Sequence, residues 1–336
     1  MARRRDSLWW KLLPPLFLGM AAFVGLAVYA HWGDLVKALA GFRVWFLLPV
    51  LGLASLNYLT RFLRWQYYLR RCEIDVGARL SAGVFFSGLA MSITPGKFGE
   101  LFKSLLLKEK AGVRIATSAP VVIVERLTDL VGVLLLMGVG LTRYSSGRIV
   151  FVAGAALVVV LFLGLAFSPR LLQRLVPLLA RSWLKDKGTE GMQESTRTFA
   201  LLLRPGAFLV GSGLGVVAWF WECLAFYLVF IGLGWHGLTL FTATFVYAAA
   251  TLAGALSMLP GGLGMTEGSM AGLLVAFDVG RQTAAAGVLV TRACTLWFAV
   301  LVGVVSYALQ RRRVGPVAAG DTAAERAPPS TDRHDD

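Results

Sequence analysis

The stretch "AMSITPGKFGELFKSLLLKEK", residues 90–110, decides how this chain folds. It interrupts an apolar run with Pro95, Gly96 and Gly99, and it places Lys97 at the interruption. Proline and glycine break helices, and broken backbone at membrane depth is tolerated only where protein or a water-filled cavity covers it. The stretch therefore predicts a helical hairpin whose turn lies inside the protein.

The rest of the sequence has the composition of a membrane protein. Of its 336 residues, 57% are hydrophobic and 15% are charged, and the apolar residues come in blocks of about 17 to 26. A helix of about 20 apolar residues can cross a bilayer. The formal charge of +14 comes mostly from short basic clusters between the blocks, which is typical of cytoplasmic loops and not of a nucleic-acid surface. We therefore expect an all-α polytopic membrane protein.

Six apolar blocks are long enough for full crossings, and two more are broken by Pro-Gly. The predicted crossings are 12–30, 44–66, 115–141, 149–167, 206–232 and 283–309, and the broken stretches are 80–110 and 238–277. If both broken stretches are re-entrant hairpins, 23 basic residues lie on the side of the N-terminus and 5 on the other side. This bias favours six crossings plus two hairpins, about eight membrane segments, with both termini cytoplasmic.

The alternative, in which both broken stretches cross fully, places the four basic residues of loop 103–114 outside, so it is less favoured. We expect a cytoplasmic N-terminus over 1–11, a membrane domain over 12–310 and a disordered cytoplasmic tail over 311–336. Loop 168–205, with seven basic and three acidic residues, is predicted to form a helix pair that touches anionic headgroups.

The Pro-Gly motif occurs twice. "AMSITPGKFG" at 90–99 and "ALSMLPGGLG" at 255–264 share Ala, Ser, Pro, Gly and Gly at a constant offset of 165. Three predicted crossings lie between the copies, so the second copy must be upside down relative to the first. One Pro-Gly alone fits an ordinary kink equally well, but two in equivalent positions favour a shared interior site, as in transporters with inverted repeats. The repeats are predicted around 80–141 and 238–309.

Charged residues follow the two motifs in parallel. A glutamate comes soon after each motif, at Glu100 and Glu267, and an arginine follows each Pro-Gly by about thirty residues, at Arg126 and Arg292. Each glutamate is expected to clamp an arginine, or to titrate during ligand release. Glu222, in "AWFWECLAFY", is expected to have a structural or pairing role.

An ionic stripe lies on the predicted crossing 115–141. Glu125 and Asp129 are four residues apart, so they share one helical face with Arg126 near them. A charge at the bilayer centre costs about 3 kcal/mol, so these residues must pair or face water. The second acid calls for another cation, and we expect Lys97 or Arg292. A structural salt-bridge network and a ligand site fit the two acids equally well.

The broken helices suit an anionic ligand. Each outgoing half-helix begins near the midplane with free N–H groups and the positive end of its dipole, and arginine or lysine adds charge-assisted hydrogen bonds to phosphate. The expected ligand is the headgroup of an anionic phospholipid or a polyprenyl phosphate. The predicted headgroup site consists of Lys97, Arg126, Arg292, Gly96, Gly99, Gly261 and Gly264, and the charge or proton-coupling network consists of Glu100, Glu125, Asp129 and Glu267.

The segments "SITPGKFGELFKSLLL", "VERLTDLVG", "LPGGLGMTEG" and "TRACTLWFAVLVG" resemble the flippase-like transmembrane domain of the lysylphosphatidylglycerol synthase family. The resemblance covers about residues 10–310. It implies a polytopic protein that moves a lipid between leaflets or assists polyprenyl-linked glycan and hopanoid pathways. Bifunctional members carry a soluble aminoacyl-transfer domain after the membrane region, whereas 26 residues follow Gln310 here, so aminoacylation is not expected.

Three functions are compatible with these observations. The first is a translocator of anionic or polyprenyl-phosphate-type lipids in the cytoplasmic membrane. The second is a non-catalytic membrane partner of a glycosyltransferase or lipid-modifying enzyme, with loop 168–205 as its contact surface. An intramembrane enzyme with Glu100 or Glu267 as a base is disfavoured, because no serine or cysteine has an intramembrane histidine partner and no metal-ligand spacing is present in the sequence. No cofactor, metal or nucleic-acid partner is expected.

Overall fold

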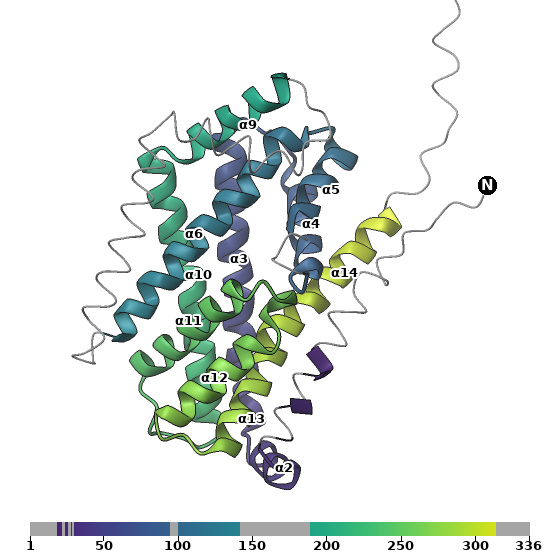
Figure 1. Cartoon of the computed structure of the whole chain (residues 1–336). Coiled ribbons are helices and arrows are strands. Elements are labelled where there is room, and N and C mark those ends of the chain that lie inside the picture. Colours follow the sequence, from purple (N-terminus) through teal and green to yellow (C-terminus); the bar gives the residue numbers. More distant parts are fainter. Residues whose placement is uncertain are drawn as a thin grey trace, which may run out of the picture.

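The computed structural model describes residues 19–21, 24–25, 28, 30–94, 100–141 and 189–313, and these residues form an all-helical protein with eleven α-helices (Figure 1). The helices are α2 (Trp32–Ala40), α3 (Leu47–Arg71), α4 (Ala78–Gly88), α5 (Phe102–Ala111), α6 (Ile115–Leu141), α9 (Thr189–Leu202), α10 (Pro205–Gly232), α11 (Leu240–Leu256), α12 (Met265–Ala276), α13 (Arg281–Arg292) and α14 (Phe298–Arg313). The all-α class predicted from the sequence is therefore confirmed for the described residues.

Among the described residues, three helical segments are long and apolar enough to cross a membrane: Val44–Arg71, Pro205–Gly232 and Arg281–Gln310. They coincide with three of the predicted crossings. The first runs five residues beyond its predicted end at 66, so its arginines belong to the helix and not to a loop.

The remaining predicted crossings have different outcomes. Helix α6 has the predicted bounds, 115–141, and carries three charged residues near its middle. The prediction over 149–167, most of 12–30, the N-terminus 1–11 and the tail beyond Arg313 lie outside the described residues.

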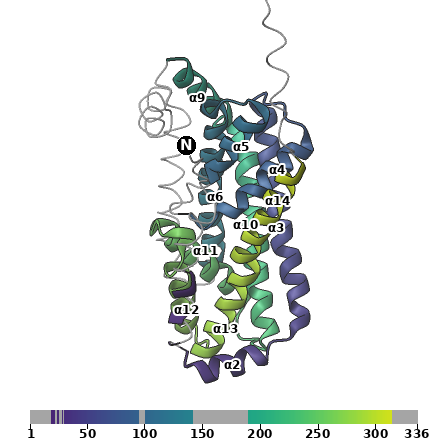
Figure 2. The same cartoon turned by 90° about the vertical axis from the view of Figure 1, so that its right-hand side faces the viewer.

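The two broken stretches form pairs of short helices at opposite ends of the molecule. Helices α4 and α5 lie at the end where α3 finishes, and α11 and α12 lie toward the end where α3 begins (Figures 1 and 2). Their tips meet between the two ends, because a Cβ built on Gly261 would lie 3.3 Å from Cα of Ile93. Residues 95–99, which hold the first Pro-Gly, lie outside the described residues.

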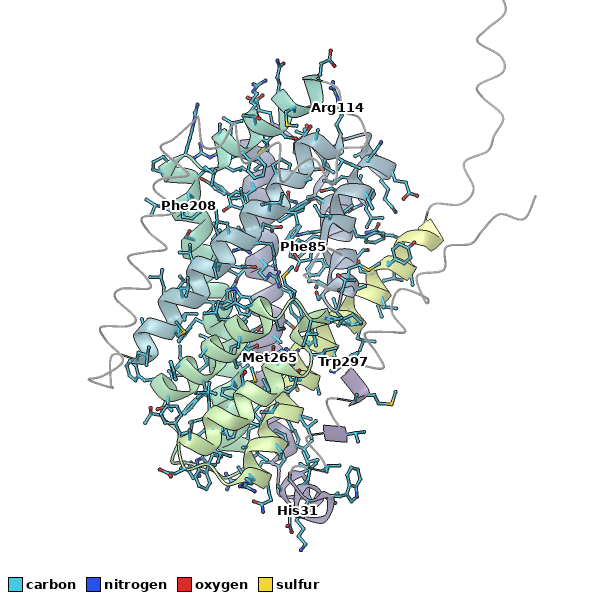
Figure 3. The ribbon with its side chains drawn as sticks, in the orientation of Figure 1. His31, Phe85, Arg114, Phe208, Met265 and Trp297 are labelled. Atoms are coloured by element: carbon cyan, nitrogen blue, oxygen red, sulfur yellow. The ribbon has the colours of Figure 1, made fainter. Side chains whose placement is uncertain are left out.

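The hydrophobic core is divided between the same two ends. One cluster gathers Trp65, Phe85 and Phe208 with the neighbouring parts of α5, α6 and α9, and another gathers Phe226 and Phe230 with α11, α12 and α13 (Figure 3). Along α6 the change from one cluster to the other falls between 124 and 133, which is where its charged residues lie. A polar layer therefore separates two apolar cores.

Small residues let the long helices approach closely at this layer. Gly132 of α6 and Gly215 of α10 face each other, and a Cβ on either would lie about 3 Å from the backbone of the other helix. Contacts of this kind are typical of helix pairs in membranes, where van der Waals packing replaces the hydrophobic effect between helices.

The predicted helix pair in loop 168–205 is described only in its second half. Helix α9 lies across the start of α6, where the Ser195 hydroxyl donates to the carbonyl of Ala116 at 2.8 Å and the Thr117 hydroxyl donates to Glu194 at 2.6 Å. Residues 168–188 lie outside the described residues.

We predict that Gly303→Ala lowers the melting temperature of the purified protein by several degrees. A Cβ at Gly303 would overlap the backbone of Leu89 and Ala90, which cannot rotate away, and overpacking of this kind costs about 1–3 kcal/mol. Thermal unfolding in detergent measures the effect.

The matched control is Gly213→Ala, also in a helix interior, where a Cβ meets nothing within 4 Å. This variant is expected to be neutral or slightly stabilising, because alanine favours helix more than glycine does. Equal melting temperatures for the two variants would contradict the close packing of α14 against residues 89–91.

Candidate functional site

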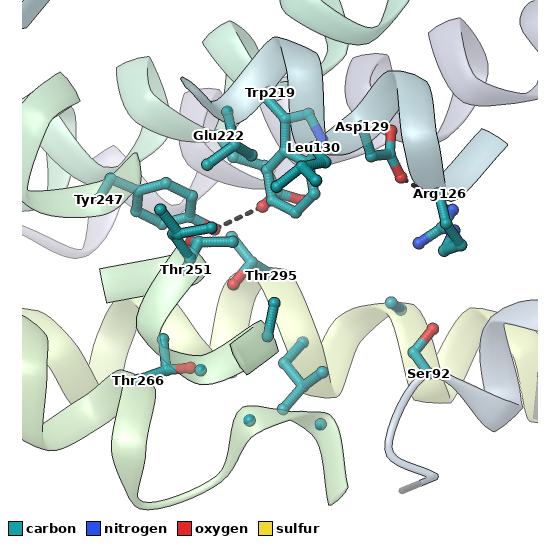
Figure 4. A pocket seen from close by; sticks show the side chains of 18 of the residues that line it. Ser92, Arg126, Asp129, Leu130, Trp219, Glu222, Tyr247, Thr251, Thr266 and Thr295 are labelled. Atoms are coloured by element: carbon teal, nitrogen blue, oxygen red, sulfur yellow. Dashed lines mark hydrogen bonds and ion pairs between the residues drawn. The ribbon is translucent and has the colours of Figure 1, made fainter. Parts of the chain in front are cut away.

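A cavity of about 330 Å³ lies between the two helix pairs. Its walls come from α3, α6, α10, α11 and the start of α14, and Ser92 of the first tip and Gly261 and Gly262 of the second also line it. Figure 4 shows Ser92 across from Thr266 and Thr295. Both halves of the chain thus contribute to a single interior site. Charged side chains reach it from each half in two separate clusters.

Asp129 is the centre of the first cluster. One oxygen accepts a hydrogen bond from Arg64 at 2.6 Å, and the other lies 2.9 Å from Arg126 and 3.8 Å from Arg61. The side chain of Arg64 is fully buried, and it also donates to the Thr128 hydroxyl at 3.2 Å. Asp129 therefore holds three arginines from α3 and α6 within one layer.

Glu100 extends this cluster to the first helix pair. Its carboxylate lies 2.9 Å from Arg126 and 3.6 Å from Arg61, both of which line the cavity. Lys103, one turn further along, pairs with Glu125 at 2.6 Å and lies 4.7 Å from the ring centre of Trp65. Lys103 and Glu125 thus form a buried pair behind the cavity wall.

The second cluster belongs to the other helix pair. Arg292 donates to Glu267 at 2.5 Å and to the carbonyl of Gly261 at 3.0 Å. The second oxygen of Glu267 accepts from the backbone N–H of Gly264 at 2.6 Å, which caps the start of α12. Gly261 and Gly264 have φ values of 60° and 84°, so this turn requires glycine.

A third polar contact lies between the clusters. Tyr247 of α11 donates a hydrogen bond to Glu222 of α10, and both residues line the cavity (Figure 4). Nearby, Tyr58 donates to the carbonyl of Thr295 at 2.7 Å, inside the π-helical turn Ala293–Trp297 that joins α13 to α14. π-Turns inside helices are frequent at functional sites.

The charges of these groups balance. The cations are Arg61, Arg64, Lys103, Arg126 and Arg292, and the carboxylates are Glu100, Glu125, Asp129, Glu222 and Glu267. Pairing removes most of the penalty of burying ions, while removal of one partner leaves an uncompensated charge. An anionic ligand must therefore compete with a carboxylate for an arginine.

The structure brings together most of the residues predicted from the sequence. Glu100 and Arg126 form an ion pair in the first cluster, and Glu267 and Arg292 form one in the second, which is the pairing that a clamp requires. Gly261 lines the cavity, and Gly264 caps α12. The predicted residues Lys97, Gly96 and Gly99 lie outside the described residues.

The additional cation predicted for the acids of α6 was Lys97 or Arg292. Lys97 lies outside the described residues, and the choice of Arg292 is wrong, because Arg292 pairs with Glu267 of its own half. Glu125 pairs instead with Lys103, and Asp129 with Arg64 as well as Arg126. The reason is proximity: α3 and α5 pack against α6 and bring Arg64 and Lys103 to these acids.

Sequence reasoning missed Arg61, Arg64 and Lys103 as site residues, because it counted them among the basic loop residues. Without them the count on the predicted cytoplasmic side falls from 23 to 20 against 5, so the bias keeps its sign. A signal was present for two of them: Arg61 and Arg64 are three residues apart, on one face of a helix that has no other charged residue before them.

We predict that Lys103→Met destabilises the protein by about 3 kcal/mol or more, since Glu125 then stays buried without its cation. The double variant Lys103→Met with Glu125→Leu is expected to recover most of that loss. Thermal unfolding in detergent compares the single and double variants.

The matched control is Arg114→Met, which breaks the exposed pair of Arg114 with Glu194 and should cost less than about 1 kcal/mol. If the double variant is as unstable as the single one, Lys103 does not stabilise the protein through its ion pair with Glu125.

Comparison with known proteins agrees with this geometry. The family model described as the lysylphosphatidylglycerol synthase TM region matches residues 16–303. A UPF0104 membrane protein of Methanothermobacter thermautotrophicus is 27% identical over 287 residues, which is 78% of this chain and 82% of the relative. A UPF0104 membrane protein of Pyrococcus horikoshii is 22% identical over 315 residues, 86% of this chain and 94% of the relative.

A further UPF0104 membrane protein, from Methanocaldococcus jannaschii, is 23% identical over 229 residues, 66% of this chain and 94% of the relative. The family match covers most of the chain, including both helix pairs and both charge clusters. This chain is a multi-pass membrane protein that belongs to the family of the lysylphosphatidylglycerol synthase transmembrane region.

Proposed function

We propose that this protein moves an anionic or polyprenyl-phosphate-type lipid between the leaflets of the cytoplasmic membrane. The observation that carries the proposal is the cavity between the two helix pairs, into which Arg126 and Arg292 reach from different halves of the chain. Each of these arginines is held by a carboxylate that a phosphate can replace. The family match, with its lipid-synthase description, adds support.

Exchange of ligands at Arg126 is the central step. Arg126 lies within 3 Å of both Glu100 and Asp129, and Arg61 lies close to the same two acids. A headgroup phosphate offers a guanidinium the same bidentate, charge-assisted hydrogen bonds as a carboxylate. Because one anion replaces another, the headgroup enters without leaving a buried arginine unpaired, and the exchange is reversible.

The two helix pairs supply the alternating access. We propose that α4 with α5 and α11 with α12 are re-entrant hairpins of an inverted repeat, with both termini cytoplasmic. The constant offset of 165 between the motifs and the opposite ends from which the pairs come support this arrangement (Figure 1). Rocking of one repeat against the other, about the contact of Ile93 with Gly261, then exposes the cavity to one leaflet at a time.

The ion pairs of Arg126 and Arg292 suggest which of these two arginines binds the headgroup first. The carboxylate of Glu267 already accepts hydrogen bonds from the backbone N–H at the start of α12 and from the guanidinium of Arg292. Beside the first hairpin, Arg126 of α6 also pairs with carboxylates, but its side chain is 23% exposed, against 9% for Arg292. We therefore place the headgroup initially at Arg126, and its transfer toward Arg292 requires that Glu267 release the arginine. No covalent step is part of this cycle.

We predict that Arg126→Gln lowers the rate of anionic-lipid flipping at least about tenfold, the factor that corresponds to loss of one charge-assisted hydrogen bond. The assay uses the full chain in vesicles with a fluorescent phosphatidylglycerol or polyprenyl phosphate, and an impermeant quencher reports the accessible leaflet. Folding should persist, because Glu100 and Asp129 keep Arg61 and Arg64 as partners.

The control is Arg114→Gln, at an exposed arginine that immediately precedes the same helix α6 and does not line the cavity. It is expected to flip lipid at the wild-type rate. Equal rates for Arg126→Gln and wild type would exclude the cavity as the headgroup site. Wild-type vesicles no faster than protein-free ones would favour a non-catalytic membrane partner instead.

A further inference from the structure

A second hollow, a groove of about 520 Å³, lies between α4 and α14. Its walls are mostly apolar, with Phe86 of α4 facing Val302 and Val305 of α14, and its polar members are Arg79, Ser306 and Gln310. Pockets of about 300–1,000 Å³ are the usual size for small-molecule ligands. An open apolar groove on a membrane protein faces lipid, so the question is which lipid it selects.

The groove has the length of one leaflet. Its lining on α14 extends from Leu301 to Gln310, about 13 Å at the helical rise of 1.5 Å per residue, against about 15 Å for half the hydrocarbon core. Its inner end adjoins the cavity, since Ala299 lines the cavity and Val302 lines the groove one turn later. Its outer end lies where α4 begins and α14 finishes (Figure 1).

Positive charge gathers at that outer end. Arg79 is exposed in the first turn of α4, lines the groove and has no ion pair among the described residues. The acids of the preceding connection, Glu73 and Asp75, do not line the groove. Basic residues at this depth attract anionic headgroups.

The groove also holds the side-chain amide of Gln310. Both Nε2 and Oε1 of Gln310 are buried, and neither has a hydrogen-bond partner among the described residues. The amide packs against Gly83, where a Cβ would overlap it. Buried amides in folded proteins nearly always have partners, and the ester and hydroxyl groups of a glycerophospholipid lie at the depth between headgroup and acyl chain.

We propose that this groove binds one phospholipid with an anionic headgroup, its acyl chain along α14 and its headgroup on Arg79. The length of the groove, its apolar lining and the positive charge at its outer end all fit such a lipid. The assignment concerns a bound lipid at the periphery of the helix pair α4–α5, and it holds whether or not the interior cavity transports anything.

A photo-crosslinker in the groove tests the assignment. The full chain with Val305→p-benzoylphenylalanine is reconstituted in phosphatidylcholine vesicles that contain a minority of phosphatidylglycerol, irradiated and analysed by mass spectrometry. Val305 is half exposed and lines the groove. The control position is Leu63→p-benzoylphenylalanine, equally exposed on α3 and outside the groove, which reports the bulk lipid.

At Val305 we expect crosslinked phosphatidylglycerol to exceed its share in the vesicle about fivefold, the factor typical of one basic residue at an anionic surface, and at Leu63 to match it. Arg79→Gln should abolish the enrichment, while Arg70→Gln, an exposed arginine at the end of α3, should preserve it. The proposal fails if there is no enrichment, if enrichment survives Arg79→Gln, or if the crosslink joins Val305 to residues 1–18 of the chain itself.

Discussion

The buried carboxylate of Asp129 is the interaction on which the rest of the structure depends. It joins the arginines of α3 to the middle of α6, at the level where one apolar core ends and the other begins. An ion at this depth is tolerated only with its partner in place. Charge pairing therefore fixes the register of α3 against α6. The close contact of Gly132 with Gly215 lies next to these pairs and joins α6 to α10.

Charge balance shapes what the interior site can do. Every cation at the cavity wall lies near a carboxylate, and in each half the glutamate comes from the same hairpin region as the Pro-Gly. A site built this way does not attract an anion by excess charge. It offers an exchange of one anion for another, which suits a headgroup that must be released as readily as it is bound.

The groove beside α14 and the interior cavity are neighbours along one helix. Ala299 faces the cavity and Val302 faces the groove, and the π-helical turn Ala293–Trp297 precedes both. Because Tyr58 donates to the carbonyl of Thr295 in that turn, α3 is linked to the point where α13 passes into α14. The lipid-facing surface and the charged interior thus share one structural element.

The sequence by itself determined the helical class, the bounds of α6 and α10, the clamp of Arg126 by Glu100 and the clamp of Arg292 by Glu267. These follow from simple rules: apolar length sets a membrane helix, and an ion within an apolar block must pair with another group or face water. Only the tertiary structure decided that Arg61, Arg64 and Lys103 are interior residues and that Lys103 takes Glu125. A basic residue near a helix end looks the same in the sequence whether its side chain contacts water or a buried acid. The packing of α3 and α5 against α6 determines which of these contacts forms.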